Sequence, residues 1–111
     1  MKHFALTLDL KDDPALIATY EQYHESIPEA IAQSIREAGI QEMEIYRFGN
    51  RLFLWMSVED DFSFERKAAL DAANPEVQAW EALMWQFQQS LKEALPGEKW
   101  LLMKPVFVQT N

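Results

Sequence analysis

A hairpin in the middle of the chain places the strongest constraint on the fold. Residues 40–48 and 51–59 both have strand-like patterns, and Gly49-Asn50 between them suits a two-residue turn in which glycine adopts a positive φ. The second strand carries apolar side chains on both faces, which is typical of a central strand. The chain is therefore expected to contain an antiparallel sheet with residues 51–59 inside it.

The flanking segments supply the other elements. Residues 2–10 alternate between apolar and polar side chains and predict a strand with one apolar face, and residues 100–108 predict a final strand. Asp13-Pro14 and Asn74-Pro75 each combine an N-cap residue with a proline suited to the first helical position. Helices are predicted over residues 14–26, 28–38, 63–72 and 75–94.

The order strand, helix, hairpin, helix, strand predicts an α+β fold, a ferredoxin-like βαββαβ sandwich formed by residues 1–111 as one domain. Helices on one face of the sheet leave the other face open, with side chains such as Tyr46, Phe53 and Trp55, or their alternates. A small domain seldom exposes a large apolar sheet face to water, so we expect a ligand or a second subunit there. A homodimer with two sheets packed face to face is the favoured expectation.

Composition excludes several classes of partner. The net charge is −8, from 18 acidic and 10 basic residues, which disfavours nucleic acid and anionic membrane surfaces. The chain has no cysteine, so neither a disulfide framework nor a cysteine-based metal site is expected. It shows no secretory signal pattern and no apolar run of membrane-spanning length, which predicts a cytoplasmic protein.

The candidate chemistry centres on Tyr20 and His24, which lie one helical turn apart beside an apolar stripe. His24 is either a core histidine with one hydrogen-bond partner or a general acid/base at the floor of a pocket. Tyr46 and Trp80 can border the same cleft, and imidazole, phenol and indole together suit a sugar, although each aromatic alone also suits the core. A metal set built from both histidines, His3 and His24, has no spacing that defines it, so no metal is predicted.

The chain resembles the L-rhamnose mutarotases and their small dimeric α+β barrel relatives over essentially its whole length. The shared features are a Tyr with a His four residues later, a Pro-Glu pair, an Ile-Tyr, a Gln-x-Trp with a Met four residues after the Trp, and a late Val-Phe. They occur here as Tyr20 and His24, Pro28-Glu29, Ile45-Tyr46, Gln78-Ala79-Trp80 with Met84, and Val106-Phe107.

The resemblance implies a cofactor-free mutarotase that interconverts the α and β anomers of a 6-deoxy-L-hexose, either L-fucose or L-rhamnose. It implies that His24 is the acid/base and that Tyr20, Tyr46 and Trp80 contact the sugar. Glu81 stands where the rhamnose enzymes have a second Trp, so it is a candidate sugar contact and favours a sister branch associated with fucose.

Two other classes stay open at this point, because the same fold hosts different functions. One is a cofactor-free monooxygenase or a module that binds haem or another small ligand. The other is a non-catalytic dimeric sensor domain in which His24 belongs to the core.

Overall fold

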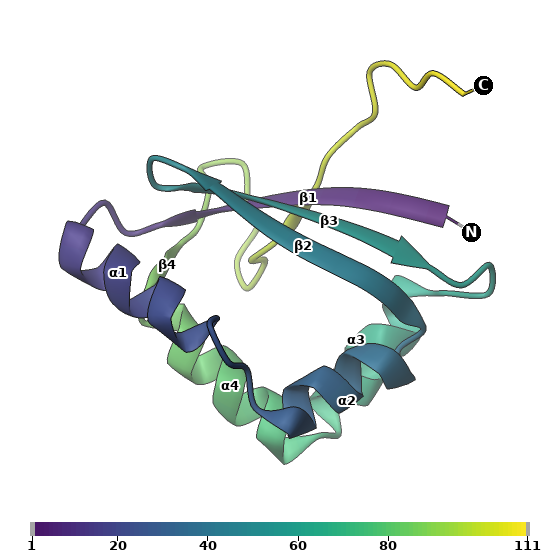
Figure 1. Cartoon of the computed structure of the whole chain (residues 1–111), viewed down its shortest axis with the longest axis horizontal. Coiled ribbons are helices and arrows are strands. Elements are labelled where there is room, and N and C mark those ends of the chain that lie inside the picture. The colour runs from purple at the N-terminus through teal and green to yellow at the C-terminus, as the bar shows by residue number, and fades with distance from the viewer. Residues whose placement is uncertain (1, 111) are drawn as a thin grey trace.

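The computed structural model describes residues 2–110, and its strands form one antiparallel sheet (Figure 1). The main strands are β1 (Lys2–Leu10), β2 (Ile40–Phe48) and β3 (Arg51–Val58), followed by the short β4 (Gln88–Gln89) and β5 (Leu101–Leu102). The strand order is β2-β3-β1-β4, and β5 also pairs with β1. The expected ferredoxin-like α+β fold is confirmed.

The β2–β3 hairpin has the predicted turn, and its bounds are those predicted except that β3 ends one residue early, at Val58. Gly49 has a φ of 61°, a conformation that a residue with a Cβ rarely adopts. Leu54 of β3 is paired with Ile45 of β2 on one side and with Leu6 of β1 on the other. Because strand side chains alternate, these apolar residues share the face of the sheet that looks toward the helices.

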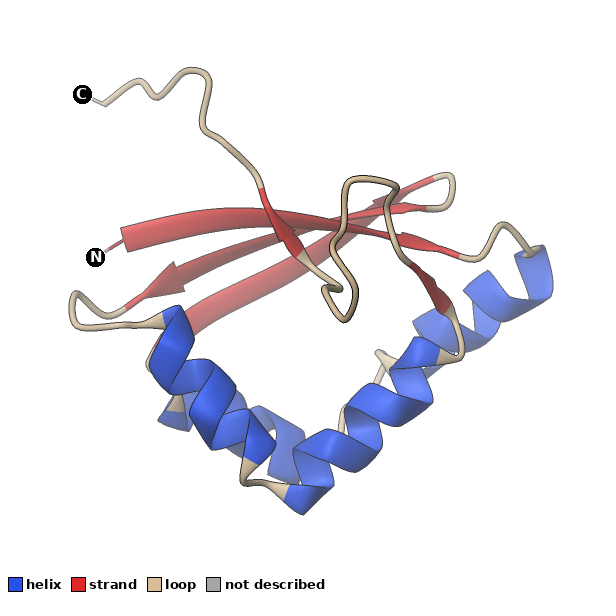
Figure 2. Cartoon of the chain, turned by 180° about the vertical axis from the view of Figure 1, so that it is seen from behind, coloured by secondary structure: helices blue, strands red, loops and turns tan. Residues whose placement is uncertain are grey.

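The helices cover that one face of the sheet (Figure 2). They are α1 (Pro14–Tyr23), α2 (Glu29–Glu37), α3 (Phe64–Ala72) and α4 (Pro75–Trp85). The predicted caps form, since the Asp13 carboxylate accepts hydrogen bonds from the amides of Ala15 and Leu16, and the Asn74 side chain caps α4 in the same way. Among the described residues, no helix is long and apolar enough to cross a membrane.

Two helices end earlier than the sequence predicts. α1 was expected to reach about Ser26 but ends at Tyr23, with His24 as its C-cap. α4 was expected to reach residue 94 but ends at Trp85, because the chain then turns and Gln88–Gln89 pairs with the end of β1. Phe87, which was predicted to lie within this helix, is buried in the turn that leads into β4.

The predicted final strand, residues 100–108, forms only at Leu101–Leu102. One further hydrogen bond joins the Met103 amide to the carbonyl of Ala5, and Pro105, two residues later, has no amide to continue the ladder. Beyond this point the chain leaves the sheet (Figure 1), and Phe107 is 80% exposed.

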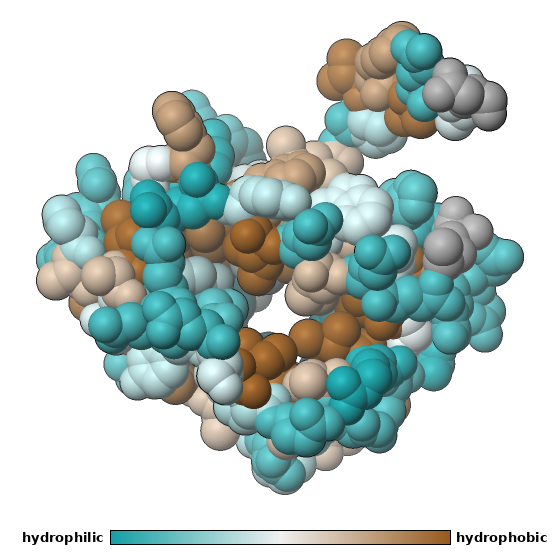
Figure 3. Space-filling model, in the orientation of Figure 1, coloured by the Kyte–Doolittle hydropathy of each residue, from teal (hydrophilic) through white to brown (hydrophobic). Residues whose placement is uncertain are grey.

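The core is divided into two clusters of buried residues. One packs at the Leu54–Met56 end of β3, and the other joins Leu10 and Leu52 to Tyr20, Met84 and Phe87. The helix layer is V-shaped, with α1 and α4 in one arm and α2 and α3 in the other (Figure 1). Between the arms and the sheet the surface is hollowed and rimmed by hydrophobic residues (Figure 3).

Candidate active site

A cavity of about 880 Å³ lies between the sheet and the two arms of the helix layer. This volume is typical of small-molecule sites, and the mixture of apolar walls with a few polar groups is typical as well. Four of the five predicted site residues line it: Tyr20, His24, Trp80 and Glu81. The packing of α1 and α4 against the sheet thus brings these four side chains together at one cavity.

The end of α1 determines how His24 is held. As the C-cap residue, it lies where the helix stops and the chain turns toward α2. Its Nδ1 lies 2.8 Å from the carbonyl oxygen of Tyr20. A carbonyl can only accept, so Nδ1 carries the proton in this hydrogen bond and Nε2 is the nitrogen available to a ligand.

Two aromatic rings frame the imidazole of His24. The Tyr20 ring lies 4.3 Å from it, centroid to centroid, and the Trp80 ring 5.6 Å from it at an angle of 63°. Burial raises the pKa of Tyr20 to about 12, and a hydrogen bond with Gln88 opposes part of this increase. Tyr20 is therefore a neutral phenol across the physiological pH range.

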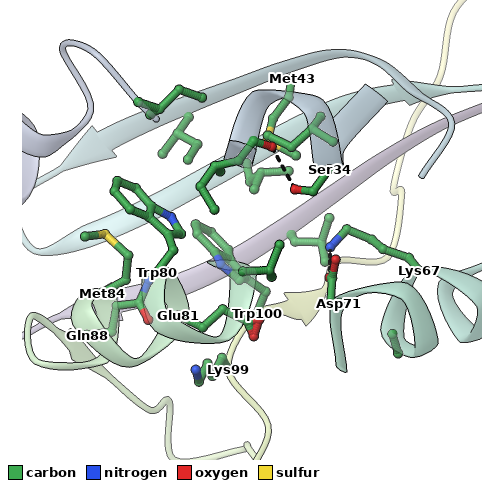
Figure 4. Close-up of a pocket in the computed structure, with 18 of the residues that line it drawn as sticks. Ser34, Met43, Lys67, Asp71, Trp80, Glu81, Met84, Gln88, Lys99 and Trp100 are labelled. Atoms are coloured by element: carbon green, nitrogen blue, oxygen red, sulfur yellow. Dashed lines mark hydrogen bonds and ion pairs between the residues drawn. The ribbon is translucent and has the colours of Figure 1, made fainter. Parts of the chain in front are cut away.

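α4 presents the aromatic and acidic side chains of the site. Trp80 and Glu81 are adjacent and partly exposed, and both line the cavity. Figure 4 shows Trp80 and Met84 on the same side of the cavity, with Trp100 beside Glu81. The arrangement offers a flat apolar surface next to a carboxylate, a combination suited to a ring that carries hydroxyl groups.

Tyr46, the fifth predicted site residue, does not line this cavity with the other four. Strand alternation turns Ile45 toward the helices and Tyr46 to the opposite face of the sheet. There the Tyr46 hydroxyl donates to Glu44 at 2.9 Å, which raises its pKa, and the ring lies 6.1 Å from that of Phe53. Tyr46 borders instead a separate hollow of about 210 Å³, which also reaches His24.

The sequence analysis missed several residues that line the cavity. From β2, Met43 lines the cavity together with Ile45, and the available signal was that the two residues are two positions apart and so share one face of the strand. From α3, Lys67 and Asp71 contribute an ion pair whose Nζ–Oδ2 distance is 2.5 Å. Their spacing of four residues was visible in the sequence, but nothing there showed that this face of α3 looks inward.

His3 lies far from this chemistry. Its ring lies 5.2 Å from that of Trp55, on the open face of the sheet, whereas His24 lies on the helix side. The two histidines therefore stand on opposite faces, and a metal set that contains both is incompatible with the fold.

Comparison with known proteins gives one consistent family. The family model of L-rhamnose mutarotase matches residues 3–109. The L-fucose mutarotase of Xanthomonas campestris pv. campestris is 52% identical over 103 residues, which cover 90% of this chain and 82% of that protein.

Solved structures show the same fold. The L-rhamnose mutarotase of Formosa agariphila superposes with a TM-score of 0.73 at 20% identity, covering 99% of this chain and 100% of the other. Tetracenomycin F2 cyclase of Streptomyces glaucescens, a polyketide cyclase, superposes with a TM-score of 0.64 at 12% identity, covering 100% and 99%. The fold alone thus hosts more than one chemistry, but the family match covers nearly the whole chain: this protein belongs to the L-rhamnose mutarotase family.

Proposed function

We propose that this protein is a mutarotase that interconverts the α and β anomers of L-fucose, with His24 as the acid/base. Family membership supports the reaction, and the 52% identical L-fucose mutarotase supports the sugar. The observation that carries the mechanism is the hydrogen bond from His24 Nδ1 to the carbonyl of Tyr20, which holds the imidazole at the cavity wall and leaves Nε2 for the substrate.

Mutarotation breaks the bond between C1 and the ring oxygen and re-forms it on the other face of the carbonyl. Opening adds a proton to the ring oxygen and removes one from the anomeric hydroxyl, and closure reverses both transfers. Protonated His24 gives its Nε2 proton to the ring oxygen while water takes the proton of the anomeric hydroxyl. After the open-chain aldehyde turns, the neutral imidazole recovers the proton on closure. No electron is transferred, so the reaction needs no redox cofactor.

The neighbouring residues position the sugar. The Trp80 indole offers a flat surface for the C–H groups of the ring, next to His24. Tyr20, a neutral phenol, can donate to a sugar oxygen, and the Glu81 carboxylate can accept from a hydroxyl. General acid/base catalysis contributes about 10²- to 10⁴-fold, which suits a reaction that already proceeds in water.

Replacement of His24 by Asn tests the mechanism. Asn is polar and tolerated at helix C-termini, so we expect the fold to persist while exchange slows by about 100-fold or more. Saturation-difference NMR on the anomeric protons of L-fucose measures the exchange rate. His3→Asn is the matched control, because His3 lies on the other face of the sheet. A folded His24→Asn protein that exchanges anomers like the parent would overturn the assignment.

We also propose a homodimer formed through the open face of the sheet. Aromatic side chains cluster there without cover from the helices. Tyr46 is 54% exposed and Phe53 36%, while Phe48 at the hairpin end is 90% exposed. Trp55 lies on the same face, with its ring 5.2 Å from that of His3, and the exposed Phe107 of the C-terminal segment adds apolar surface. A second copy would cover an apolar area that a small monomer seldom leaves in water.

Sedimentation at micromolar concentration tests the dimer. We expect the parent to sediment with the mass of two chains and Phe53→Lys, with a charge in the centre of the face, to sediment as one chain. Phe64→Lys is the control, because Phe64 is similarly exposed at 39% but belongs to α3 on the helix side. A parent protein with one-chain mass would contradict the proposal.

A further inference from the structure

The cavity has a second polar wall that the proposed mechanism does not use. His24 and Trp80 stand on the arm built from α1 and α4, while Lys67 and Asp71 stand on α3 in the facing arm. Figure 4 shows the Lys67–Asp71 pair reaching from α3 into the cavity, with Trp80 and Met84 on the other side. A ring bound between the arms meets both sets of groups.

The electrostatics of α3 do not account for this ion pair. Asp71 is the last residue but one of α3, so this anion lies near the negative end of the helix dipole. A basic residue four positions before an acidic one is also the weaker order for a helical pair. Both features oppose the helix field, and rules of this kind are most often broken at functional sites.

Burial gives a second argument. The side chains of Lys67 and Asp71 are only 29% and 17% exposed, and partial burial makes the desolvation of two charges costly. The pair is not needed to join α3 to α4, because the Gln78 amide already donates to the backbone carbonyl of Asp71 at 2.9 Å. The two charged groups therefore face the cavity for a reason other than helix stability or helix packing.

We propose that Lys67 and Asp71 form a specificity subsite that binds two neighbouring hydroxyls on the same side of the sugar ring. The ammonium of Lys67 donates and the carboxylate of Asp71 accepts, with Nζ and Oδ2 only 2.5 Å apart. A sugar hydroxyl can both donate and accept. One hydroxyl of a cis pair can thus donate to Asp71 while its neighbour accepts from Lys67.

The position of this subsite selects among sugars, and this step rests on the proposed function. With C1 and the ring oxygen at His24, the C3 and C4 hydroxyls point toward the facing arm of the cavity. In L-fucose these two hydroxyls are cis. In L-rhamnose the cis pair is at C2 and C3, and the C3 and C4 hydroxyls are trans. The subsite therefore favours L-fucose and D-arabinose, which share the configuration at C2 to C4, over L-rhamnose and 6-deoxy-L-glucose, the 4-epimer of L-fucose.

The test compares Asp71→Asn and Lys67→Met with the parent on these four sugars by anomer-exchange NMR. For L-fucose and D-arabinose we expect kcat/KM to fall about 10- to 100-fold, mainly through KM, which is the scale of a lost polar contact. For L-rhamnose and 6-deoxy-L-glucose the change should stay within about threefold on the same scale. Glu65→Gln on the exposed side of α3 is the control, and melting followed by circular dichroism reports on folding.

Equal losses on all four sugars, or no loss on any, would overturn the subsite. Direct binding of L-fucose, measured by saturation-transfer NMR, separates this proposal from the proposed function. If the parent binds L-fucose without accelerating exchange, the mutarotase mechanism fails. The subsite is then supported if Asp71→Asn weakens binding of L-fucose more than binding of its 4-epimer, and it is overturned if both are weakened equally.

Discussion

Burial of Tyr20 predicts a specific loss of stability at alkaline pH. Its ring is 3% exposed, and burial raises its pKa from 10.0 to about 12. Below pH 10 the phenol is neutral in both the folded and the unfolded chain, so its contribution to the free energy of unfolding is constant. Between pH 10 and 12 the unfolded chain loses the proton while the folded chain keeps it, so stability falls as the pH rises. At about 1.4 kcal/mol per pKa unit, the shift of about two units corresponds to about 3 kcal/mol.

The assay is urea unfolding, followed by circular dichroism at several pH values from 8 to 12, for the parent and Tyr20→Phe. Lysines and other tyrosines titrate in both proteins, so the difference between the two pH profiles isolates Tyr20. We expect Tyr20→Phe to lose less stability than the parent above pH 10, with the gap approaching about 3 kcal/mol near pH 12. Parallel profiles across this range would refute the reasoning, because they would show that the Tyr20 phenol titrates alike in both states.

Three further predictions concern specificity and stability. Glu81→Trp should shift the ratio of kcat/KM for L-fucose and L-rhamnose by about 1–3 kcal/mol, and an unchanged ratio in anomer-exchange NMR would place Glu81 outside the sugar contacts. Asp13→Ala should lower the free energy of unfolding by about 1 kcal/mol, since it removes the acceptor for two amides of α1; Asp13→Ser, which keeps a cap, should recover most of the loss in urea titrations. Leu8→Ala should cost about 2–5 kcal/mol, because Leu8 is 0% exposed, and a loss below 1 kcal/mol would contradict its complete burial.

The sequence predicted the parts of the fold that depend on local chemistry. Alternation defined β1, and Gly49-Asn50 defined the hairpin turn. Asp13-Pro14 and Asn74-Pro75 defined two helix starts to the residue. These signals work because caps, prolines and turn glycines act through neighbours only a few residues away.

The errors fall where distant parts of the chain compete. The helix that starts at Pro75 was predicted to run to residue 94. Pairing of Gln88 with Leu10, near the other end of the chain, ends it at Trp85. The final strand was overpredicted because local pattern could not show that pairing with β1 stops near Met103.

The site was predicted in part for the same reason. Tyr20 and His24 converge because they lie one helical turn apart at the end of α1, and Trp80 of α4 lies beside His24. Tyr46 lies outside the larger cavity because strand alternation puts it on the opposite face of β2 from Ile45, and it borders the smaller hollow beside Tyr20 and His24. Lys67 and Asp71 were missed because an ion pair four residues apart is typical of a solvent-exposed helix face. Only the packing of the helices shows that this face of α3 lines the cavity.

One edge of β1 holds two short partners, Gln88–Gln89 beside Asp9–Leu10 and Leu101–Leu102 beside Leu6–Thr7. The loop over residues 90–100 is thereby tied at both ends to a single rigid strand, and its last residues, Lys99 and Trp100, reach the cavity. Neither of these two pairings involves β2 or β3. Trp100 packs against both core clusters, so the earlier residues of the loop are the part of this connection that can be exchanged with the smaller effect on the fold, while His24 and Trp80 are held by α1 and α4.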